Sequence, residues 1–327
     1  MTNGQLSSLK TRVGDLRQIA SVRRIVLDDG PERGVRALSF STGGGLDFWV
    51  LTDRSMDIGT LSWRGVQLAW QSAGGFRAPA LIDVQDDGGR GFNRGFSGFL
   101  ITCGLNHIRH PKDGEPLHGR FPFTPARLTA YGEDWESAEP FLFCEGEVVQ
   151  SRYGGEALRL KRRIVAPIGG ASIRILDTVE NLGAEDVPHA ILYHFNLGYP
   201  AICSGTTVEW NGERLLGPIE LPDEQGLVPA RSWPASRDGR AQCVVRSPTG
   251  AASEMTVSFT FEASTLGHLQ VWRDLRKHAG VLSIEPCSTP LQNEGEEAAT
   301  LAPGERRTYR LEISLASAPP MPFPAAD

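Results

Sequence analysis

Short apolar runs separated by turn residues recur along the whole chain, and this pattern restricts the fold more than any other feature. The runs alternate apolar with polar side chains or are rich in Val, Ile, Phe and Leu, and Gly, Pro, Asp or Asn separates most of them. Runs at a spacing of roughly 8–12 residues are typical of β-strands joined by turns. The 37 glycines and 22 prolines among the 327 residues supply such turns. The sequence therefore predicts an all-β protein, a large antiparallel β-sandwich with few short helices.

Two of the predicted strands carry a charged residue on a face that is otherwise apolar. Side chains of a strand alternate between its two faces. Arg162 therefore shares a face with Leu160 and Ile164, and Asp177 shares a face with Ile175.

The chain has no linker, low-complexity segment or internal repeat that would divide it. We therefore expect one β-sandwich domain over residues 21–316. An N-terminal segment, residues 1–20, precedes this domain and is expected to carry one short helix. A C-terminal tail rich in Ala and Pro, residues 317–327, follows it.

Bulk properties exclude several classes of protein. The formal net charge is −6 and no block of Lys and Arg stands out, which argues against nucleic-acid binding. No stretch of ~18 apolar residues predicts a membrane span, and the polar first 20 residues contain no secretory signal. The five cysteines are widely spaced and form no C-x-x-C pair, so reduced thiols in a cytoplasmic protein are expected.

A histidine and a glutamate are the first candidates for acid/base chemistry. In the predicted strand around His194, Asn196 lies on the same face, while Tyr193 and Phe195 lie on the opposite face. The bulky residues would face the core, and the His and the amide would face a cleft. Glu285 ends another apolar run, where a buried carboxylate is costly unless it is hydrogen-bonded or catalytic. A His and a Glu on separate strands of one cleft can move protons without a cofactor.

A histidine-rich stretch, residues 107–118, suggests a second group of candidates. It contains His107, His110 and His118, but H-x-x-H is no standard zinc spacing and no cysteine pair supports it. A metal site is therefore the less favoured interpretation, and we expect none. His118 is followed by Gly119, which permits a sharp turn or a close approach to a ligand, and by Arg120, whose guanidinium can bind an oxygen-rich ligand.

Other chemistries have weaker support in the sequence. The glycine-rich segment Gly88–Gly98 matches no phosphate-binding loop and lacks the strand-to-helix context of a dinucleotide site. No G-x-S-x-G motif is present, and Cys103 or Cys287 would need a histidine in contact to act as a nucleophile. We therefore expect no cofactor.

Several motifs, in this order, resemble the galactose mutarotase-like (aldose 1-epimerase) superfamily, and most closely its DUF4432 branch. The resemblance covers about residues 20 to 315 and implies one β-supersandwich domain that binds a small carbohydrate. The motifs are Asp53–Gly59, Thr102–Leu105, Leu117–Arg120, Pro125–Ala126, Asp177–Asn181, Tyr193–Pro200, Ile284–Pro286 and Leu301–Glu305.

The resemblance also implies roles for single residues. His194 would be the general acid that protonates the ring oxygen, Glu285 the general base that takes the anomeric proton, and His118 a residue that orients the sugar. Reclosure of the opened ring gives the other anomer and needs no metal or cofactor. Predicted substrate contacts are Arg54, Arg109, Arg120, Asn196 and Trp272, the last as a stacking platform.

The chain also departs from the family pattern. In well-studied mutarotases the histidine precedes the asparagine of its motif by four residues, whereas His194 precedes Asn196 by two. Both spacings keep the pair on one face of a strand. Arg120 stands where the family has glycine, and Arg109 and Arg120 would suit a sugar acid or sugar phosphate. An aldose–ketose isomerase, another sugar epimerase and a carbohydrate-binding protein remain open alternatives, and exposed strand edges could pair two chains into a homodimer.

Overall fold

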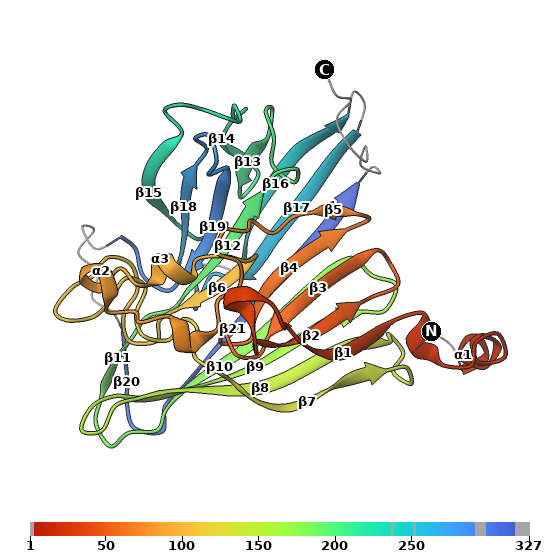
Figure 1. Ribbon diagram of the computed structural model, residues 1–327, viewed down its shortest axis with the longest axis horizontal. Helices are drawn as coiled ribbons and strands as arrows, with labels where there is room; N and C mark the ends of the chain where they lie inside the picture. Colours follow the sequence, from red (N-terminus) through yellow and green to blue (C-terminus); the bar gives the residue numbers. More distant parts are fainter. Residues whose placement is uncertain (1–2, 237–238, 251–252, 292–298, 318–327) are drawn as a thin grey trace.

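The computed structural model describes residues 3–236, 239–250, 253–291 and 299–317 (Figure 1). These residues are mostly β-strand, and every strand pairing is antiparallel, so the predicted all-β antiparallel sandwich is confirmed. None of the described helices has both the length and the apolar character needed to cross a bilayer. The helices of the described part are α1 (Asn3–Lys10), α2 (Asp86–Gly89) and α3 (Phe92–Gly95), with the 3-10 turns η1 (Leu16–Gln18), η2 (Gly30–Glu32) and η3 (Pro79–Leu81).

The described strands form one broad sheet and three smaller ones. The broad sheet has the order β14 (Glu213–Leu216), β13 (Thr207–Trp210), β16 (Arg240–Gly250), β17 (Ser253–Glu262), β21 (Arg306–Ser317), β10 (Ser172–Asn181), β9 (Ala157–Pro167), β8 (Phe141–Ser151) and β7 (Arg127–Asp134). A second sheet has the order β1 (Ser21–Val26), β2 (Arg36–Ser41), β3 (Leu46–Leu51), β4 (Asp57–Trp63) and β5 (Val66–Gln67). A third sheet, called here the pocket sheet, has the order β15 (Leu227–Pro234), β18 (His268–Asp274), β19 (Val281–Cys287), β12 (Leu192–Gly198) and β6 (Leu100–Cys103). A short ladder joins β11 (Val187–His189) and β20 (Ala299–Leu301).

The β1–β5 sheet and the pocket sheet cover different parts of the broad sheet. The backbone N–H of Val22 on β1 donates to the Glu133 carboxylate on β7 (2.8 Å). Phe195 on β12 packs against Phe259 on β17, with 5.1 Å between the ring centroids. The two smaller sheets meet where residues 68–70 run beside β12. The sandwich is therefore one wide sheet facing two narrower sheets that lie edge to edge (Figure 1).

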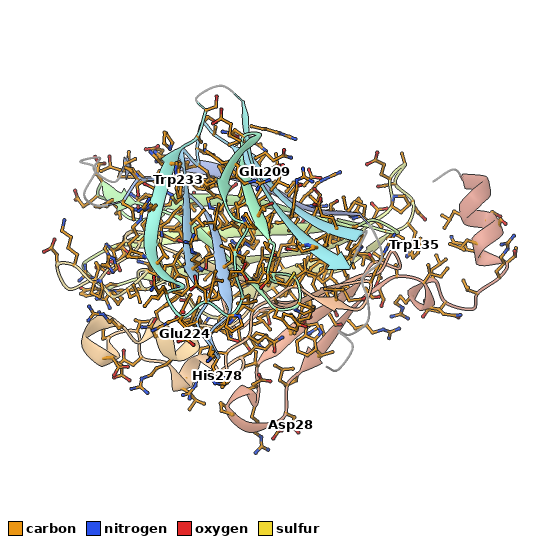
Figure 2. All side chains as sticks on the ribbon, turned by 90° about the horizontal axis from the view of Figure 1, so that it is seen from above. Asp28, Trp135, Glu209, Glu224, Trp233 and His278 are labelled. Atoms are coloured by element: carbon orange, nitrogen blue, oxygen red, sulfur yellow. The ribbon has the colours of Figure 1, made fainter. Side chains whose placement is uncertain are left out.

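One large hydrophobic cluster fills the space between the layers, and its members run from Ala20 to Leu315. The first strand begins at Ser21 and the last ends at Ser317. Helix α1 lies in the predicted N-terminal segment and projects at one end of the molecule (Figures 1 and 2). Of the predicted C-terminal tail, residues 318–327 lie outside the described residues.

Candidate active site

Neighbouring strands of the pocket sheet set three polar side chains in one row. Phe195 of β12 pairs with Ile284 of β19, and this register brings His194 opposite Glu285. On the other side of β19, Glu285 pairs with Gln270 of β18. Residues that lie directly opposite one another in antiparallel strands project to the same face. The register of three strands therefore assembles a His–Glu–Gln row from residues far apart in the sequence.

Alternation along β12 separates the core from this row. Tyr193, Phe195 and Leu197 belong to the large hydrophobic cluster. His194 and Asn196 point to the other face of the sheet, as the sequence pattern predicts. That face is also covered, since His194 is only 4% exposed and Asn196 0%. The cover comes from the α3 segment and from the loop that follows β6, both of which contribute residues that surround His194.

The imidazole of His194 is held from behind by Asn196. The Asn196 Nδ2 donates to the backbone carbonyls of Gly98 and His194, each at 3.1 Å, and this fixes the orientation of the amide. Its Oδ1 therefore faces the ring and lies 2.6 Å from His194 Nδ1, while the Ser283 hydroxyl donates to the same oxygen at 2.8 Å. A carbonyl oxygen only accepts hydrogen bonds, so Nδ1 carries a proton. This arrangement leaves Nε2 as the nitrogen that can exchange a proton.

The carboxylate of Glu285 is completely buried and is held through one oxygen only. Gln270 Nε2 donates to Glu285 Oε2, and Gln270 Oε1 accepts from Arg109 Nε at 2.7 Å. The other oxygen, Oε1, has no hydrogen-bond partner within the described residues and lies 3.4 Å from His194 Nε2. His194 and Glu285 thus each have one atom held by the protein and one reactive atom facing the other group.

His118 approaches the pair from the loop that follows β6. Its ring is nearly perpendicular to that of His194, with 5.4 Å between centroids. The loop turns sharply here, since φ of His118 is 63° and φ of Gly119 is 82°. The backbone of Gly119 lies so close to the Gly104 carbonyl that a Cβ would not fit. Burial, followed by nearby positive charges, holds the pKa of His118 well below 6.5. The ring is therefore neutral near pH 7, and in the described part of the chain its Nδ1 has no partner.

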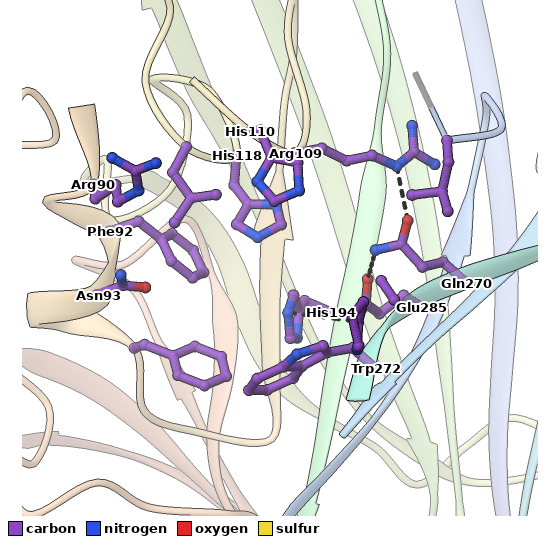
Figure 3. Close-up of a pocket in the computed structure, with 15 residues that line it drawn as sticks. Arg90, Phe92, Asn93, Arg109, His110, His118, His194, Gln270, Trp272 and Glu285 are labelled. Carbon is purple, nitrogen blue, oxygen red and sulfur yellow. Dashed lines mark hydrogen bonds and ion pairs between the residues drawn. The ribbon is translucent and has the colours of Figure 1, made fainter. Parts of the chain in front are cut away.

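These side chains line a pocket of about 350 Å³ (Figure 3). This volume is near the lower end of the range for small-molecule sites and suits one small ligand better than a polymer. Trp272 of β18 and Phe96 form an aromatic wall, with 6.1 Å between their ring centroids, and Phe96 also packs against His194 at 5.2 Å. The pocket thus combines an apolar wall with a few convergent polar groups, as ligand sites commonly do.

Two of the predicted substrate contacts are not brought to the pocket. The Arg54 guanidinium is buried, donates to the Gly95 carbonyl and lies over the Phe123 ring at 4.7 Å. Arg120 pairs with Glu115 at 3.1 Å and does not line the pocket. Both predicted roles require this correction, because tertiary contacts rather than strand alternation direct these side chains. Asn196 contacts His194 on the side away from the pocket and does not line the pocket, whereas Arg109 and Trp272 do line the pocket.

The histidine-rich loop does not gather metal ligands. His107 Nε2 lies 2.8 Å from the His110 carbonyl oxygen, within the same loop. No three His, Cys, Asp or Glu side chains of the described chain come together in a way that could hold a metal ion. Burial raises the pKa of both Cys103 and Cys287, the latter to about 12, so both remain protonated thiols. These positions do not favour covalent catalysis by cysteine.

Two features of the pocket escaped the sequence analysis. Gln270 carries the contact between Arg109 and Glu285, and its only signal is an amide within an apolar strand. The segment Gly88–Gly98 lines the pocket with the side chains of Arg90, Phe92, Asn93 and Phe96. Its alternation of glycine with aromatic and basic residues was visible, but its position was not.

Comparison with known proteins fits this architecture. The family model described as Domain of unknown function (DUF4432) matches residues 32–315. The chain belongs to the DUF4432 family. No curated protein matches the sequence.

Solved structures of low sequence identity share the fold of this DUF4432 protein. A Klebsiella pneumoniae protein with the provisional designation aldose 1-epimerase is 21% identical, with a TM-score of 0.82 over 94% of this chain and 86% of its own. A galactose mutarotase-like protein from Clostridium acetobutylicum is 12% identical, with a TM-score of 0.63 over 91% and 98% of the two chains. A galactose 1-epimerase from Lactobacillus acidophilus is 10% identical, with a TM-score of 0.53 over 90% and 98%. The galactose mutarotase-like fold is thereby confirmed.

Proposed function

We propose that this DUF4432 protein is a cofactor-independent sugar isomerase of the aldose 1-epimerase type. It would interconvert the anomers of a small sugar or sugar acid. The observation that carries the proposal is the approach of His194 Nε2 to Glu285 Oε1 at 3.4 Å in the pocket lining, with the second polar atom of each group held by the protein. The aldose 1-epimerase and mutarotase names of proteins with this fold support the same reaction class.

Exchange of anomers needs two proton transfers, one from the anomeric hydroxyl and one to the ring oxygen, and the pair can supply both. Glu285 Oε1 takes the proton of the anomeric hydroxyl while His194, protonated on both nitrogens, donates the Nε2 proton to the ring oxygen. The C1–O5 bond breaks as the C1=O bond forms. After rotation about C1–C2, the reverse transfers close the ring on the other face of C1 and return each proton to its first position.

The surrounding groups suit this reaction. Asn196 holds the Nδ1–H of His194 and thereby aims Nε2 at the ring oxygen. Gln270, itself held by Arg109, donates to Glu285 Oε2, which leaves Oε1 as the base. The unpartnered Nδ1 of His118 can contact a hydroxyl, and Trp272 offers an apolar face on which a sugar ring can lie.

The proposal is tested by NMR saturation transfer between anomers over a panel of neutral, uronic and phosphorylated sugars. Wild-type protein should accelerate exchange of at least one sugar. His194→Ala and Glu285→Gln should each reduce that rate by about 10²-fold or more, with the circular dichroism spectrum retained. His278→Gln, at an exposed histidine that does not line the pocket, is the matched control and should exchange like wild type.

Other results would identify the alternatives. Wild-type exchange in either pocket variant would contradict the acid/base assignment. Ketose signals in the same spectra would indicate an aldose–ketose isomerase. Sugar binding without exchange of any sugar would indicate a carbohydrate-binding protein.

A further inference from the structure

The glycine-rich segment Gly88–Gly98 brings an arginine to the pocket. Arg90 lies between α2 and α3, its side chain is exposed, and it lines the pocket. Among the described residues its guanidinium has no hydrogen-bond or ion-pair partner. In Figure 3, Arg90 and His110 lie on one side of His194 and Glu285, and Trp272 lies on the other side.

The two aspartates of α2, just before Arg90 in the chain, are engaged by another arginine. Arg94 pairs with Asp87 at 3.1 Å and with Asp86 at 3.8 Å. In the loop that carries His118, Arg120 pairs with Glu115 at 3.1 Å. The positive charge of Arg90 is therefore not cancelled by a direct contact within the described chain.

A second arginine adds to the positive charge inside the pocket. Arg109 uses its donors on the Gln270 side chain, on Thr289 and on the Cys287 sulfur, so among the described residues it is bound by neutral groups and contacts no carboxylate. Glu285 is the one carboxylate in the described pocket lining, against two arginines. The protein as a whole carries a net charge of −6. A cationic pocket in an acidic protein indicates selection for a negatively charged ligand.

We propose that the sugar taken by this pocket carries an anionic group, a carboxylate or a phosphate monoester, which Arg90 binds while the anomeric carbon lies at His194 and Glu285. This inference rests on the function proposed above and adds the class of substrate. An arginine offers paired N–H donors that match the oxygens of a carboxylate or phosphate. The anionic group would sit on the part of the sugar remote from C1, since Arg90 and the acid/base pair line different sides of the pocket (Figure 3).

The test compares three sugars with the same ring: a hexose, its uronic acid and its 6-phosphate, in both glucose and galactose configurations. Exchange is measured by NMR saturation transfer, and binding is measured separately by titration calorimetry. At least one anionic form should have a kcat/KM at least tenfold above that of the neutral hexose, and this advantage should shrink as NaCl is added. Preference for the uronic acid alone would identify a carboxylate, and preference for the 6-phosphate alone would identify a phosphate monoester.

Two variants make the test specific. Arg90→Gln should reduce the preference for anionic over neutral sugar by about tenfold, through KM. Arg94→Gln is the matched control, because this arginine lies four residues away, is paired with aspartates and does not line the pocket. It should keep the wild-type preference.

The outcomes separate this inference from the proposed function. If the kcat/KM for the neutral hexose equals that for both anionic forms, the inference is overturned and the isomerase proposal is left intact. Equal effects of Arg90→Gln and Arg94→Gln would have the same consequence. Anionic sugar bound through Arg90 without exchange would uphold the inference and overturn the isomerase proposal. No binding and no exchange of any sugar in the panel would overturn both.

Discussion

Two buried clusters of polar side chains lie on opposite faces of β12, and they differ in how completely they are satisfied. On the core face, Arg162 pairs with Asp177 at 2.6 Å and with Asp57 at 3.0 Å, and each of its three nitrogens has an acceptor. On the pocket face, within the described residues, Glu285 Oε1 has no hydrogen-bond partner and faces His194 Nε2 at 3.4 Å.

This difference distinguishes polar groups that stabilise the fold from polar groups that are available for a reaction. A buried polar atom without a partner costs about 1–3 kcal/mol of stability. Proteins commonly retain such a cost where function requires it. We therefore expect changes in the core cluster to act on the free energy of unfolding, and changes in the pocket cluster to act on the rate of anomer exchange.

The strongest effect is expected from Arg162→Met, which would break the core cluster. The change leaves two carboxylates buried without their cation, and loss of one partner of a buried ion pair typically costs about 3–5 kcal/mol. Urea unfolding should show this loss as a large fall in the midpoint. Combining Arg162→Met with Asp57→Asn and Asp177→Asn should recover part of the loss, because no net charge then remains buried. If the free energy of unfolding of Arg162→Met lies within about 1 kcal/mol of the wild-type value, the cluster does not have this structural role.

His189 is another buried histidine, and both of its ring nitrogens are hydrogen-bonded, unlike those of His194. His189 Nδ1 donates to the Leu105 carbonyl at 2.7 Å, and its Nε2 lies 2.6 Å from the Tyr309 hydroxyl. Burial, despite the Leu105 bond, lowers the pKa of His189 to about 4. Below pH 6.5 the unfolded chain then binds the proton more readily than the folded chain.

The contribution of His189 is therefore complete above pH 6.5 and is lost as the pH falls toward 4. The loss amounts to about 3 kcal/mol for a shift of this size. His189→Gln should flatten the dependence of the unfolding free energy on pH in that window, which urea unfolding from pH 4.5 to 7.5 measures. If the free energy of unfolding depends on pH equally in wild type and variant, His189 does not make this contribution to stability.

A smaller effect, on the rate of anomer exchange, is expected from Gln270→Met. This change removes the side chain that links Arg109 to Glu285 and leaves both of these residues in place. The carboxylate loses the donor on Oε2, so Oε1 is no longer held in its position as the base. We expect kcat for anomer exchange to fall about tenfold near neutral pH, with KM little changed.

The matched control for this change is Gln150→Met, at a buried glutamine that bonds to the Leu105 N–H and to Asn106 away from the pocket. It should reduce stability and leave kcat near the wild-type value. If neither glutamine variant lowers kcat, or both lower it equally, Gln270 does not position the base.

Alternation along single strands made part of this arrangement predictable from the sequence. It placed Tyr193 and His194 on opposite faces of one strand, as observed. It also placed Arg162 and Asp177 on faces that are otherwise apolar, and the structure pairs these two residues across β9 and β10. A charged residue in phase with core positions was thus a usable signal of a buried ion pair.

The remaining parts depend on contacts that one sequence does not encode in any local pattern. The row of His194, Glu285 and Gln270 requires the register of three strands, and that register is set by the whole sheet. The positions of arginine side chains in loops could be predicted even less well from the sequence. Arg54 and Arg120 were predicted to contact a ligand but contact the protein, while Arg90 lines the pocket from a glycine-rich segment whose position the sequence did not indicate.

The central claim is that the His194–Glu285 pair serves chemistry and not stability. Glu285→Gln tests it most directly when the rate of anomer exchange and the free energy of unfolding are measured on the same preparation. The account predicts a fall in exchange of about 10²–10⁴-fold, with a free energy of unfolding within about 1 kcal/mol of wild type, because Glu285 Oε1 has no hydrogen-bond partner to lose among the described residues and the amide has the same shape as the carboxylate. Exchange within tenfold of wild type, or a loss of stability like that of Arg162→Met, would contradict it.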